Sequence, residues 1–228
     1  MQKLVVLTGA GISAESGVAT FRDSNGLWCN HRVEEVATPE AWYKDKQLVL
    51  DFYNARRRQL QEVAPNDAHK ILAELEKDFE VTIITQNVDD LHERAGSANI
   101  IHLHGELKKA RSEKNESIVL NWEGDMQLGD KASDGSQLRP HIVWFGEAVP
   151  MIEKAMAVTT TADIFLIVGT SLQVYPAAGL MNFVRPGTPV YLIDPNPPAV
   201  KFPREFYIPM GASEGMKVFR EKIKNYKC

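Results

Sequence analysis

The chain has 228 residues, enough for one large domain or for one domain with a small insertion. Its net charge of −4 gives no electrostatic reason to expect nucleic acid binding. No apolar run approaches the ~20 residues that cross a bilayer, and the N-terminus has no signal-peptide pattern. The two cysteines, Cys29 and Cys228, form no disulfide framework. We therefore expect a monomeric, cytoplasmic protein without a nucleic acid or membrane partner.

The first predicted element is an apolar strand at Val5–Leu7 that runs into a glycine turn. Gly9, Gly11 and Ala14 fit the G-x-G-x-x-G/A pattern of a dinucleotide-binding turn. Gly9 permits the tight turn, and Gly11 lets the backbone approach a pyrophosphate. The small Ala14 lets the next helix pack closely with its free N–H groups toward the phosphates. Alone, the pattern also fits a strand-to-helix turn of any α/β protein.

The segment after this turn departs from the usual dinucleotide-binding fold. That fold continues with a helix, a second strand and an acidic residue roughly 20 positions after the turn. Here a polar loop follows instead, and it contains Thr20, Phe21, Arg22, Asp23, Asn25 and Gly26. The loop puts an aromatic ring and a guanidinium where the ribose and nicotinamide end of a cofactor would lie.

Short apolar runs recur along the chain with helical patterns between several of them, at Val5–Leu7, Val81–Thr85, Ile100–Leu103, Ile142–Trp144, Ile164–Val168 and Val190–Ile193. This alternation predicts an α/β fold, with a Rossmann-like, mainly parallel sheet flanked by helices. Two regions do not fit and predict a smaller inserted module, at about 30–65 and 108–138. The large part of this single catalytic domain then covers about 1–29, 66–107 and 139–228.

Polar residues follow four of these strands, at the edge where open α/β sheets bind their ligands. The first group is Gln86, Asn87, Val88 and Asp89, and the second is His104, beside Gly105, which leaves room for a ligand. The others are Gly169, Thr170 and Ser171, and then Asp194, Pro195 and Asn196. Taken singly, a carboxylate there is a helix cap and a histidine is structural. The agreement of four strand ends predicts a nucleotide site.

The motifs in combination resemble the sirtuins, NAD-dependent protein-lysine deacylases, and most of all the bacterial members of their desuccinylase-type class. The resemblance spans nearly the whole chain in family order. It rests on Thr8-Gly9-Ala10-Gly11-Ile12-Ser13-Ala14-Glu15-Ser16-Gly17, Thr20-Phe21-Arg22, Gly26-Leu27-Trp28, Thr85-Gln86-Asn87-Val88-Asp89, His102-Leu103-His104-Gly105-Glu106, Arg139-Pro140 through Phe145-Gly146-Glu147, and Gly169-Thr170-Ser171.

The resemblance implies a reaction that consumes NAD. The substrate's acyl oxygen attacks the ribose C1′ as nicotinamide leaves, and the alkylimidate formed is then attacked by a ribose hydroxyl, yielding O-acyl-ADP-ribose. Within this scheme His104 is the general base, because a neutral imidazole accepts a proton near physiological pH. Asn87 and Asp89 orient the cofactor and support the cationic ribose transition state. Phe21 shields the reacting ribose face, and Arg22 lies in the cofactor loop.

The resemblance also implies the residues of two binding sites. The cofactor site comprises Gly9, Ala10, Gly11, Ser13, Ala14, Thr20, Phe21, Arg22, Trp28, Gln86, Asn87, Val88, Asp89, Gly169, Thr170, Ser171, Asp194, Pro195, Asn196 and Ala212. The acylated peptide lies extended between two loops near Val143–Glu147 and Leu172–Tyr175, pairing through its backbone. Its contacts are Val143, Phe145, Gly146, Glu147, Val174 and Tyr175. Alternatively, Trp144, Phe145, Val174 and Tyr175 are core or lid residues.

Acyl specificity is the sharpest local hypothesis. Tyr53 and Arg56 are spaced i,i+3 on a predicted helix, so they can point together at one target. A guanidinium and a phenol make a good receptor for a carboxylate. In the resembling class this pair reads the acid of succinyl- or malonyl-lysine, while acetyl groups are also accepted. The alternative is a solvated basic face, since Arg57 and Arg58 follow directly.

The chain departs from the common sirtuin pattern of two cysteine pairs that hold a structural zinc ion. Between His104 and Arg139 it has no cysteine and no histidine. Ser112 sits near the expected first cysteine, and Ala132-Ser133-Asp134 near the later pair. Oxygen groups alone make a poor structural zinc site. We therefore predict no zinc and no other metal. Without zinc, the segment Lys108–Gln137 is ordered by the packing of Val119, Leu120 and Trp122, or it is mobile.

Two other functions are compatible with these residues. An enzyme with the same NAD site could transfer ADP-ribose to protein or to water. A non-enzymatic NAD- or ADP-ribose-binding module could have lost productive peptide binding, although His104 and the Tyr53/Arg56 pair argue against this.

Overall fold

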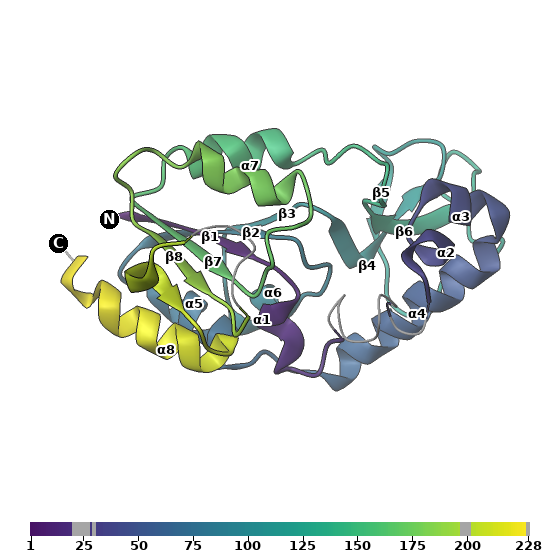
Figure 1. The fold of residues 1–228 in the computed structure, drawn as a ribbon. Helices are drawn as coiled ribbons and strands as arrows, with labels where there is room; N and C mark the ends of the chain where they lie inside the picture. Colours follow the sequence, from purple (N-terminus) through teal and green to yellow (C-terminus); the bar gives the residue numbers. More distant parts are fainter. Residues whose placement is uncertain (20–27, 29–30, 197–201, 227–228) are drawn as a thin grey trace.

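The computed structural model describes residues 1–19, 28, 31–196 and 202–226. The molecule has a larger part built on a six-stranded sheet and a smaller part built on a three-stranded sheet, which lie side by side (Figure 1). Both chain termini lie on the larger part, at the end remote from the smaller one (Figure 1).

The larger sheet is parallel throughout, with the strand order β3-β2-β1-β7-β8-β9. Its strands are β1 (Lys3–Thr8), β2 (Glu80–Thr85), β3 (Ile100–His102), β7 (Ile164–Val168), β8 (Val190–Ile193) and β9 (Tyr207–Ile208). The strand order reverses its direction between β1 and β7, which is the position where open α/β sheets bind their ligands. The predicted Rossmann-like fold class is confirmed.

Helices cover both faces of this sheet because successive residues of a strand point to opposite faces. Leu4 and Val6 pack toward α5 (Asp67–Leu75) and α8 (Ala212–Lys222). Val5 and Leu7 pack toward α7 (Ile152–Thr159) and the 3₁₀ helix η1 (Ala177–Phe183). The short elements α1 (Gly11–Ala14), α6 (Leu91–Ala95), η2 (Arg204–Phe206) and η3 (Ile223–Tyr226) complete this part.

The smaller part combines helices from one segment with strands from another. Its helices are α2 (Val33–Val36), α3 (Pro39–Lys44) and α4 (Lys46–Glu62), and its antiparallel sheet has the order β5-β4-β6. The strands are β4 (Gly105–Ser112), β5 (Val119–Asn121) and β6 (Leu138–Ile142). Trp42, Leu50 and Leu107 from the two segments share one apolar core. Each segment therefore buries its apolar side against the other.

One strand prediction is wrong. The run Ile142–Trp144 was expected in the parallel sheet, but β6 ends at Ile142 and pairs antiparallel with β4. Its apolar character reflects burial in the core of the smaller part, where Trp144 is 2% exposed. The sixth parallel strand is instead the two-residue β9, too short to show a period in the sequence. The residue boundaries given for the two parts stay a prediction.

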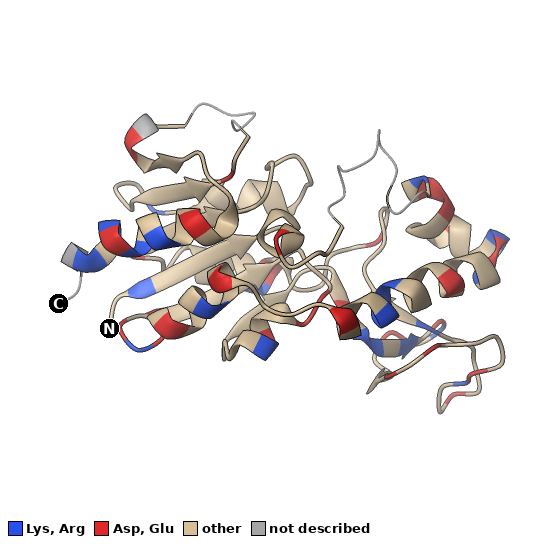
Figure 2. Ribbon diagram, turned by 90° about the horizontal axis from the view of Figure 1, so that it is seen from below, with Lys and Arg blue, Asp and Glu red and all other residues tan. Residues whose placement is uncertain are grey.

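The exposed helices carry charges of both signs. Acidic and basic residues alternate along the helix that leads to the C-terminus (Figure 2), where Lys217 contacts Glu214 and Arg220 contacts Glu74 of α5. Among the described residues, no helix combines the length and the apolar composition needed to cross a membrane.

Candidate active site

The glycine turn after β1 is packed against the loop that follows β7. Gly9 and Gly11 donate backbone hydrogen bonds to the carbonyls of Val168 and Gly169, at 3.0 and 2.9 Å. A Cβ atom at Gly9 would lie 2.7 Å from the Thr170 Cβ, and one at Gly11 would lie 2.6 Å from the Gly169 Cα. Both glycines are therefore required by the close approach of two protein loops. A direct approach of Gly11 to a pyrophosphate stays a prediction.

The packing role predicted for Ala14 is wrong, because its side chain is exposed at the end of α1. The helix is instead anchored by Ile12 and Ser13, which are fully buried. Thr20, Phe21 and Arg22, the most diagnostic residues of the following loop, lie outside the described residues.

Three polar side chains meet beyond the end of β2. The Ser13 hydroxyl donates to Asp89 Oδ2 at 3.0 Å and accepts from the Asn87 amide at 3.1 Å. All three side chains are at least nine-tenths buried. The Asn87 backbone N–H is fixed in turn by the Thr85 hydroxyl at 3.0 Å. The structure thus brings together two of the predicted catalytic residues and one predicted cofactor residue.

The carboxyl group of Asp89 is held in an unfavourable environment for its charge. Burial raises its pKa, and the negative charges of Asp90 and Glu93 raise it further. Hydrogen bonds from the Leu91 N–H and the Ser13 hydroxyl oppose the shift without cancelling it. A buried carboxylate with little compensation interacts strongly with a positive charge that develops beside it.

A second polar layer lies beneath this cluster, and sequence reasoning did not single it out. The Thr8 hydroxyl donates to Thr85 at 2.8 Å and lies 3.1 Å from His92 Nε2. His69 Nε2 lies 3.4 Å from the Ser13 hydroxyl, and the two imidazole rings are 4.9 Å apart. Burial lowers the pKa of both histidines, to about 4 for His69. Polar residues at core-facing positions of β1, α5 and α6 were the available signal.

His104 lies between β3 and β4, at the same edge as the Asn87 and Asp89 cluster. Its Nδ1 atom is 3.0 Å from the Gln86 carbonyl, which accepts only from a protonated Nδ1. In the neutral ring the Nε2 atom therefore keeps the lone pair. Burial lowers the pKa of His104, so the ring is neutral near physiological pH. These features suit a general base.

A glycine is required at position 105 by the close approach of β6. It has a φ of +83°, and a Cβ atom there would lie 2.0 Å from the His141 carbonyl oxygen. A side chain at position 105 would therefore collide with β6, and room for a ligand beside His104 stays a prediction.

The remaining predicted cofactor residues line the carboxyl edge. The Gln86 amide donates to the Thr170 hydroxyl at 3.2 Å, which joins the loops after β2 and β7. Gly169 packs with its backbone on α1, and Ser171 is half-buried beside it. After β8, Asp194 accepts from the Asn196 N–H at 2.9 Å, and Pro195 is exposed.

Three further cofactor candidates contribute in other ways. Ala212 is buried at the start of α8, where Glu15 of the α1 segment accepts from the Ser213 N–H at 3.1 Å. Ala10 is half-buried before α1. Val88 packs against the core of the smaller part, and its carbonyl accepts from the Leu107 N–H at 2.8 Å. The contacts of these three residues with a cofactor stay a prediction.

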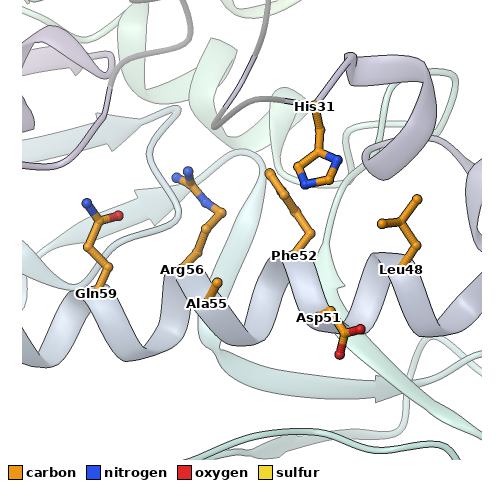
Figure 3. A pocket seen from close by; sticks show the side chains of 7 residues that line it. All are labelled: His31, Leu48, Asp51, Phe52, Ala55, Arg56 and Gln59. Atoms are coloured by element: carbon orange, nitrogen blue, oxygen red, sulfur yellow. The ribbon is translucent and has the colours of Figure 1, made fainter.

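Trp28, also predicted as a cofactor contact, lies over α4. Its ring is 5.1 Å from that of Phe52, and the Arg56 guanidinium lies 4.3 Å from the ring centroid. Arg56 and Phe52 line a cavity of about 270 Å³ together with His31, Leu48, Asp51, Ala55 and Gln59. In Figure 3, Arg56 and Gln59 rise from the same side of α4 as Phe52. Arg56 therefore reaches a cavity large enough for a short acyl chain.

Tyr53 is fully buried beside this cavity. Its ring packs 5.0 Å from that of Phe52, and its oxygen accepts from Trp144 Nε1 at 3.0 Å. Burial raises the pKa of the phenol, and Arg56 is the charged group that opposes the shift most. The structure thus places the two side chains close enough to interact, while their action on one carboxylate stays a prediction. Arg57, by contrast, is buried and donates to the Leu107 carbonyl, so the alternative of a solvated basic face is wrong for it.

The two predicted peptide loops differ in how much of their backbone is available. In the first, the N–H groups of Val143, Phe145 and Glu147 donate to carbonyls of His104, Ala37 and Trp144. Pairing with a peptide would therefore use other backbone groups of this loop, such as those of Gly146. Exposed aromatic rings mark both loops: Phe145 is 44% and Tyr175 74% exposed, whereas Val174 is half-buried.

The Glu147 side chain is committed to the protein itself. Its Oε1 atom lies 2.7 Å from Arg139 and 3.1 Å from Arg111, and its Oε2 atom accepts from the backbone N–H of Trp144 at 2.8 Å. Arg139 and Arg111 are almost fully buried. The carboxylate of Glu147 therefore holds the loop, while a backbone contact of Glu147 with the peptide stays a prediction.

The expected zinc position is occupied by hydrogen-bonded oxygen groups. The Ser112 hydroxyl lies 2.7 Å from both Asp134 Oδ2 and the Ser136 hydroxyl, and Asp134 Oδ1 accepts from Ser136 at 2.6 Å. These groups satisfy one another and offer neither thiolate nor imidazole, so they do not fit a structural zinc ion. Leu120 and Trp122 pack partly against the nearby core as predicted, but Val119 is 40% exposed.

Within the described ranges, one other group has metal-type ligands, namely Glu93, His102 and Glu106. His102 lies 2.6 Å from Glu93, and Lys109 lies 2.6 Å from Glu106. These groups are paired with each other at the surface and require no ion.

The donor set at the carboxyl edge fits NAD. Hydroxyl, amide and carboxylate groups follow four strands at the same edge of the sheet, and the carboxylate of Asp194 follows β8. The fold and this site define an enzyme that handles a dinucleotide beside a neutral histidine.

Comparisons with known proteins agree. The profile of the Sir2 family matches residues 9–176. A protein of Bacteroides thetaiotaomicron named NAD-dependent protein deacylase is 57% identical, with 98% of each chain covered. One of the same name from Escherichia coli K12 is 46% identical, covering 97% of this chain and 82% of that one. A Sir2 homologue in complex with NAD has a TM-score of 0.88 at 38% identity, covering 99% and 91%. The chain belongs to the Sir2 family.

Proposed function

We propose that this protein is an NAD-dependent protein-lysine deacylase that favours acyl groups ending in a carboxylate. The observation that carries the catalytic part is that two residues lie at the same edge of the sheet: the buried Asp89, whose donors among the described residues are neutral, and His104, whose Nδ1 donates to the Gln86 carbonyl. The names of the relatives support deacylation. A related structure is a Sir2–p53 peptide–NAD⁺ complex, which supports a protein substrate.

Bound NAD supplies a glycosidic bond to a cationic nicotinamide ring, whose departure makes ribose C1′ electrophilic. The chain's own residues supply orientation, charge and proton transfer. Asn87 and Asp89 are held rigidly by Ser13 and Thr85, so they can orient the ribose without reorganising. The Asp89 carboxylate stabilises positive charge that develops on the sugar. His104 Nε2 accepts the proton of a ribose hydroxyl, since Nδ1 is committed to Gln86.

The acyl preference rests on the cavity beside α4. Arg56 is 7% exposed and lines the cavity, so a carboxylate that enters it meets a largely desolvated guanidinium. Such a charge-assisted pair is roughly twice as strong as a neutral hydrogen bond. Succinyl and malonyl groups present this carboxylate, whereas an acetyl group fills less of the cavity and lacks the charge.

The deciding experiment offers the protein NAD with peptides carrying succinyl- or acetyl-lysine and identifies the products by mass spectrometry. We expect O-acyl-ADP-ribose, nicotinamide and free lysine peptide, with higher kcat/KM for succinyl-lysine. Release of plain ADP-ribose with intact acyl-lysine would indicate NAD hydrolysis or ADP-ribosyl transfer instead. Absence of turnover would indicate a binding module.

The variant Arg56→Met tests the acyl preference. We expect it to lower kcat/KM for succinyl-lysine at least about tenfold, because one hydrogen-bonded charge pair is lost. The value of kcat/KM for acetyl-lysine should change much less. The matched control is Arg58→Met on the same helix, because Arg58 is half-exposed and paired with Asp125. An unchanged preference in Arg56→Met rules out the proposed receptor.

We also propose that the smaller part folds without zinc. The support is the closed set of hydrogen bonds among Ser112, Asp134 and Ser136, together with the lack of cysteine and histidine between His104 and Arg139.

A further inference from the structure

We propose that Trp144 is a positioning residue for acyl specificity, because its indole N–H fixes the direction in which the buried Tyr53 hydroxyl donates. The proposal rests on the proposed preference for acidic acyl groups and names a residue that sets it from outside the cavity.

The argument starts from the single hydrogen bond between the two side chains. Trp144 Nε1 donates to the Tyr53 oxygen at 3.0 Å, and both side chains are almost fully buried. Indole is a donor only, whereas a phenol both donates and accepts. A phenolic hydrogen lies in the plane of its ring, on one side of the oxygen or the other. With the indole donor on one side, the Tyr53 hydrogen points to the opposite side.

The residues around the phenol indicate which group its hydrogen can reach. Arg56 lies one helical turn along α4 from Tyr53, and both side chains pack on Phe52, whose ring centroid is 5.0 Å from that of Tyr53 and 5.7 Å from the Arg56 guanidinium. Burial raises the pKa of Tyr53, so the phenol stays protonated and remains a donor. A carboxylate bound to Arg56 can therefore also accept from Tyr53, provided that the hydroxyl is already turned toward it. Preorganisation of this kind lowers the cost of binding.

Trp144 is itself held by an ionic network. The Arg139 guanidinium lies 3.2 Å from the centroid of the Trp144 ring, and Glu147 accepts from the backbone N–H of Trp144 at 2.8 Å. Arg139 and Arg111 both bind the Glu147 carboxylate. The indole therefore has little freedom to turn its N–H away from Tyr53. This network belongs to the loop predicted to bind the peptide, so it connects that loop with the acyl cavity.

The test measures the ratio of kcat/KM for succinyl-lysine to that for acetyl-lysine. Trp144→Phe keeps an aromatic ring beneath Arg139 but removes the N–H. We expect the ratio to fall roughly threefold to tenfold, the effect of one ordinary hydrogen bond, mainly through a higher KM for succinyl-lysine. Tyr53→Phe is expected to lower the ratio at least as much. In the Tyr53→Phe background, Trp144→Phe should cause no further fall.

The matched control is Trp42→Phe. Trp42 is equally buried, lies 5.8 Å from Trp144 ring to ring, and loses an indole hydrogen bond to Glu113 rather than to Tyr53. A purely structural effect would change both substrates equally in both tryptophan variants. An unchanged ratio in Trp144→Phe, or a further fall in the double variant, overturns the positioning role alone. A parent protein without preference for succinyl-lysine overturns this role together with the proposed acyl specificity.

Discussion

Asp89 and Glu147 are both largely buried carboxylates, yet the two regions around them treat the negative charge in opposite ways. At the edge of the large sheet, burial and acidic neighbours raise the pKa of Asp89, and only neutral donors oppose the shift. In the loop beside the smaller part, burial also disfavours the charge of Glu147, but Arg139 and Arg111 reverse the effect and lower its pKa. The Asp89 carboxylate has no cationic partner within the described part of the chain and can interact with a positive charge on a ligand. The Glu147 carboxylate is already paired with two arginines and stabilises a loop.

The first prediction concerns the sheet edge and has the largest effect. His104→Tyr and His104→Gln should lower kcat for deacylation at least about 100-fold, because a general base contributes on the order of 10²–10⁴. The thermal unfolding curve should stay cooperative. Turnover close to that of the parent in either variant would show that His104 is not the base.

The second prediction concerns the loop network. Glu147→Gln should destabilise the protein by about 2–4 kcal/mol, because it leaves Arg139 and Arg111 without their carboxylate. Urea unfolding at pH 7 measures this. Glu116→Gln is the matched control: Glu116 also faces Arg111, at 3.8 Å, but is 70% exposed, and its loss should cost less than about 1 kcal/mol.

The same network has a defined pH dependence. Because the folded pKa of Glu147 is lowered, its stabilisation is fully present above its unfolded pKa of about 4.3. It is lost as the pH falls through the lower folded value. The stability difference between the parent and Glu147→Gln should therefore shrink on acidification below about pH 4. A difference that stays constant down to pH 2 would contradict the ionic account.

The third prediction is that Asp89→Asn changes the stability of the fold in the opposite direction to Glu147→Gln. A raised folded pKa means that the charged form is disfavoured on folding, and this penalty is present at pH values above the unfolded pKa of about 3.9. The variant should therefore be at least as stable as the parent at pH 7, yet less active. The neighbouring control Asp90→Asn should destabilise slightly, since Asp90 is paired with Lys108 and Arg94. If Asp89→Asn lowered the free energy of unfolding by more than about 1 kcal/mol, the charge of Asp89 would stabilise the fold as that of Glu147 does, contrary to this prediction.

The smallest expected effect is that of metal removal. Dialysis against EDTA should leave the thermal midpoint of the protein unchanged, because the groups at the expected zinc position bond to one another. Ser112→Ala should cost about 1 kcal/mol through the loss of its hydrogen bonds. A marked fall of the midpoint with EDTA, restored by zinc, would refute the zinc-free interpretation.

The sequence predicts the parallel sheet and the strand-end residues well because both depend on short-range patterns. Apolar β-branched runs followed by glycine or polar residues recur whenever a buried strand exits a sheet. Ile142–Trp144 carries the same apolar signal but is buried by the smaller part. A local pattern reports burial and does not tell which core supplies it.

Residue roles are harder to predict when they depend on neighbours far along the chain. Gly11 and Gly105 are glycines because carbonyl or Cα atoms of residues 169 and 141 approach them, which no local turn rule contains. Glu147 reads as a surface acid until Arg111 and Arg139 are placed around it. The core-facing positions of His69 and His92 show in the sequence, but only the fold places the two rings beneath Ser13 and Thr8.

The strand order has a consequence for biosynthesis. β1 lies at the centre of the sheet, between β2 and β7, and β7 is made only after most of the chain. At a translation rate of roughly 5–20 residues per second, the first strand waits on the order of ten seconds for its second partner. Throughout that time one edge of Lys3–Thr8 is exposed on the nascent chain, so ribosome-bound chains cut short before Ile164–Val168 should be the species that chaperones bind most.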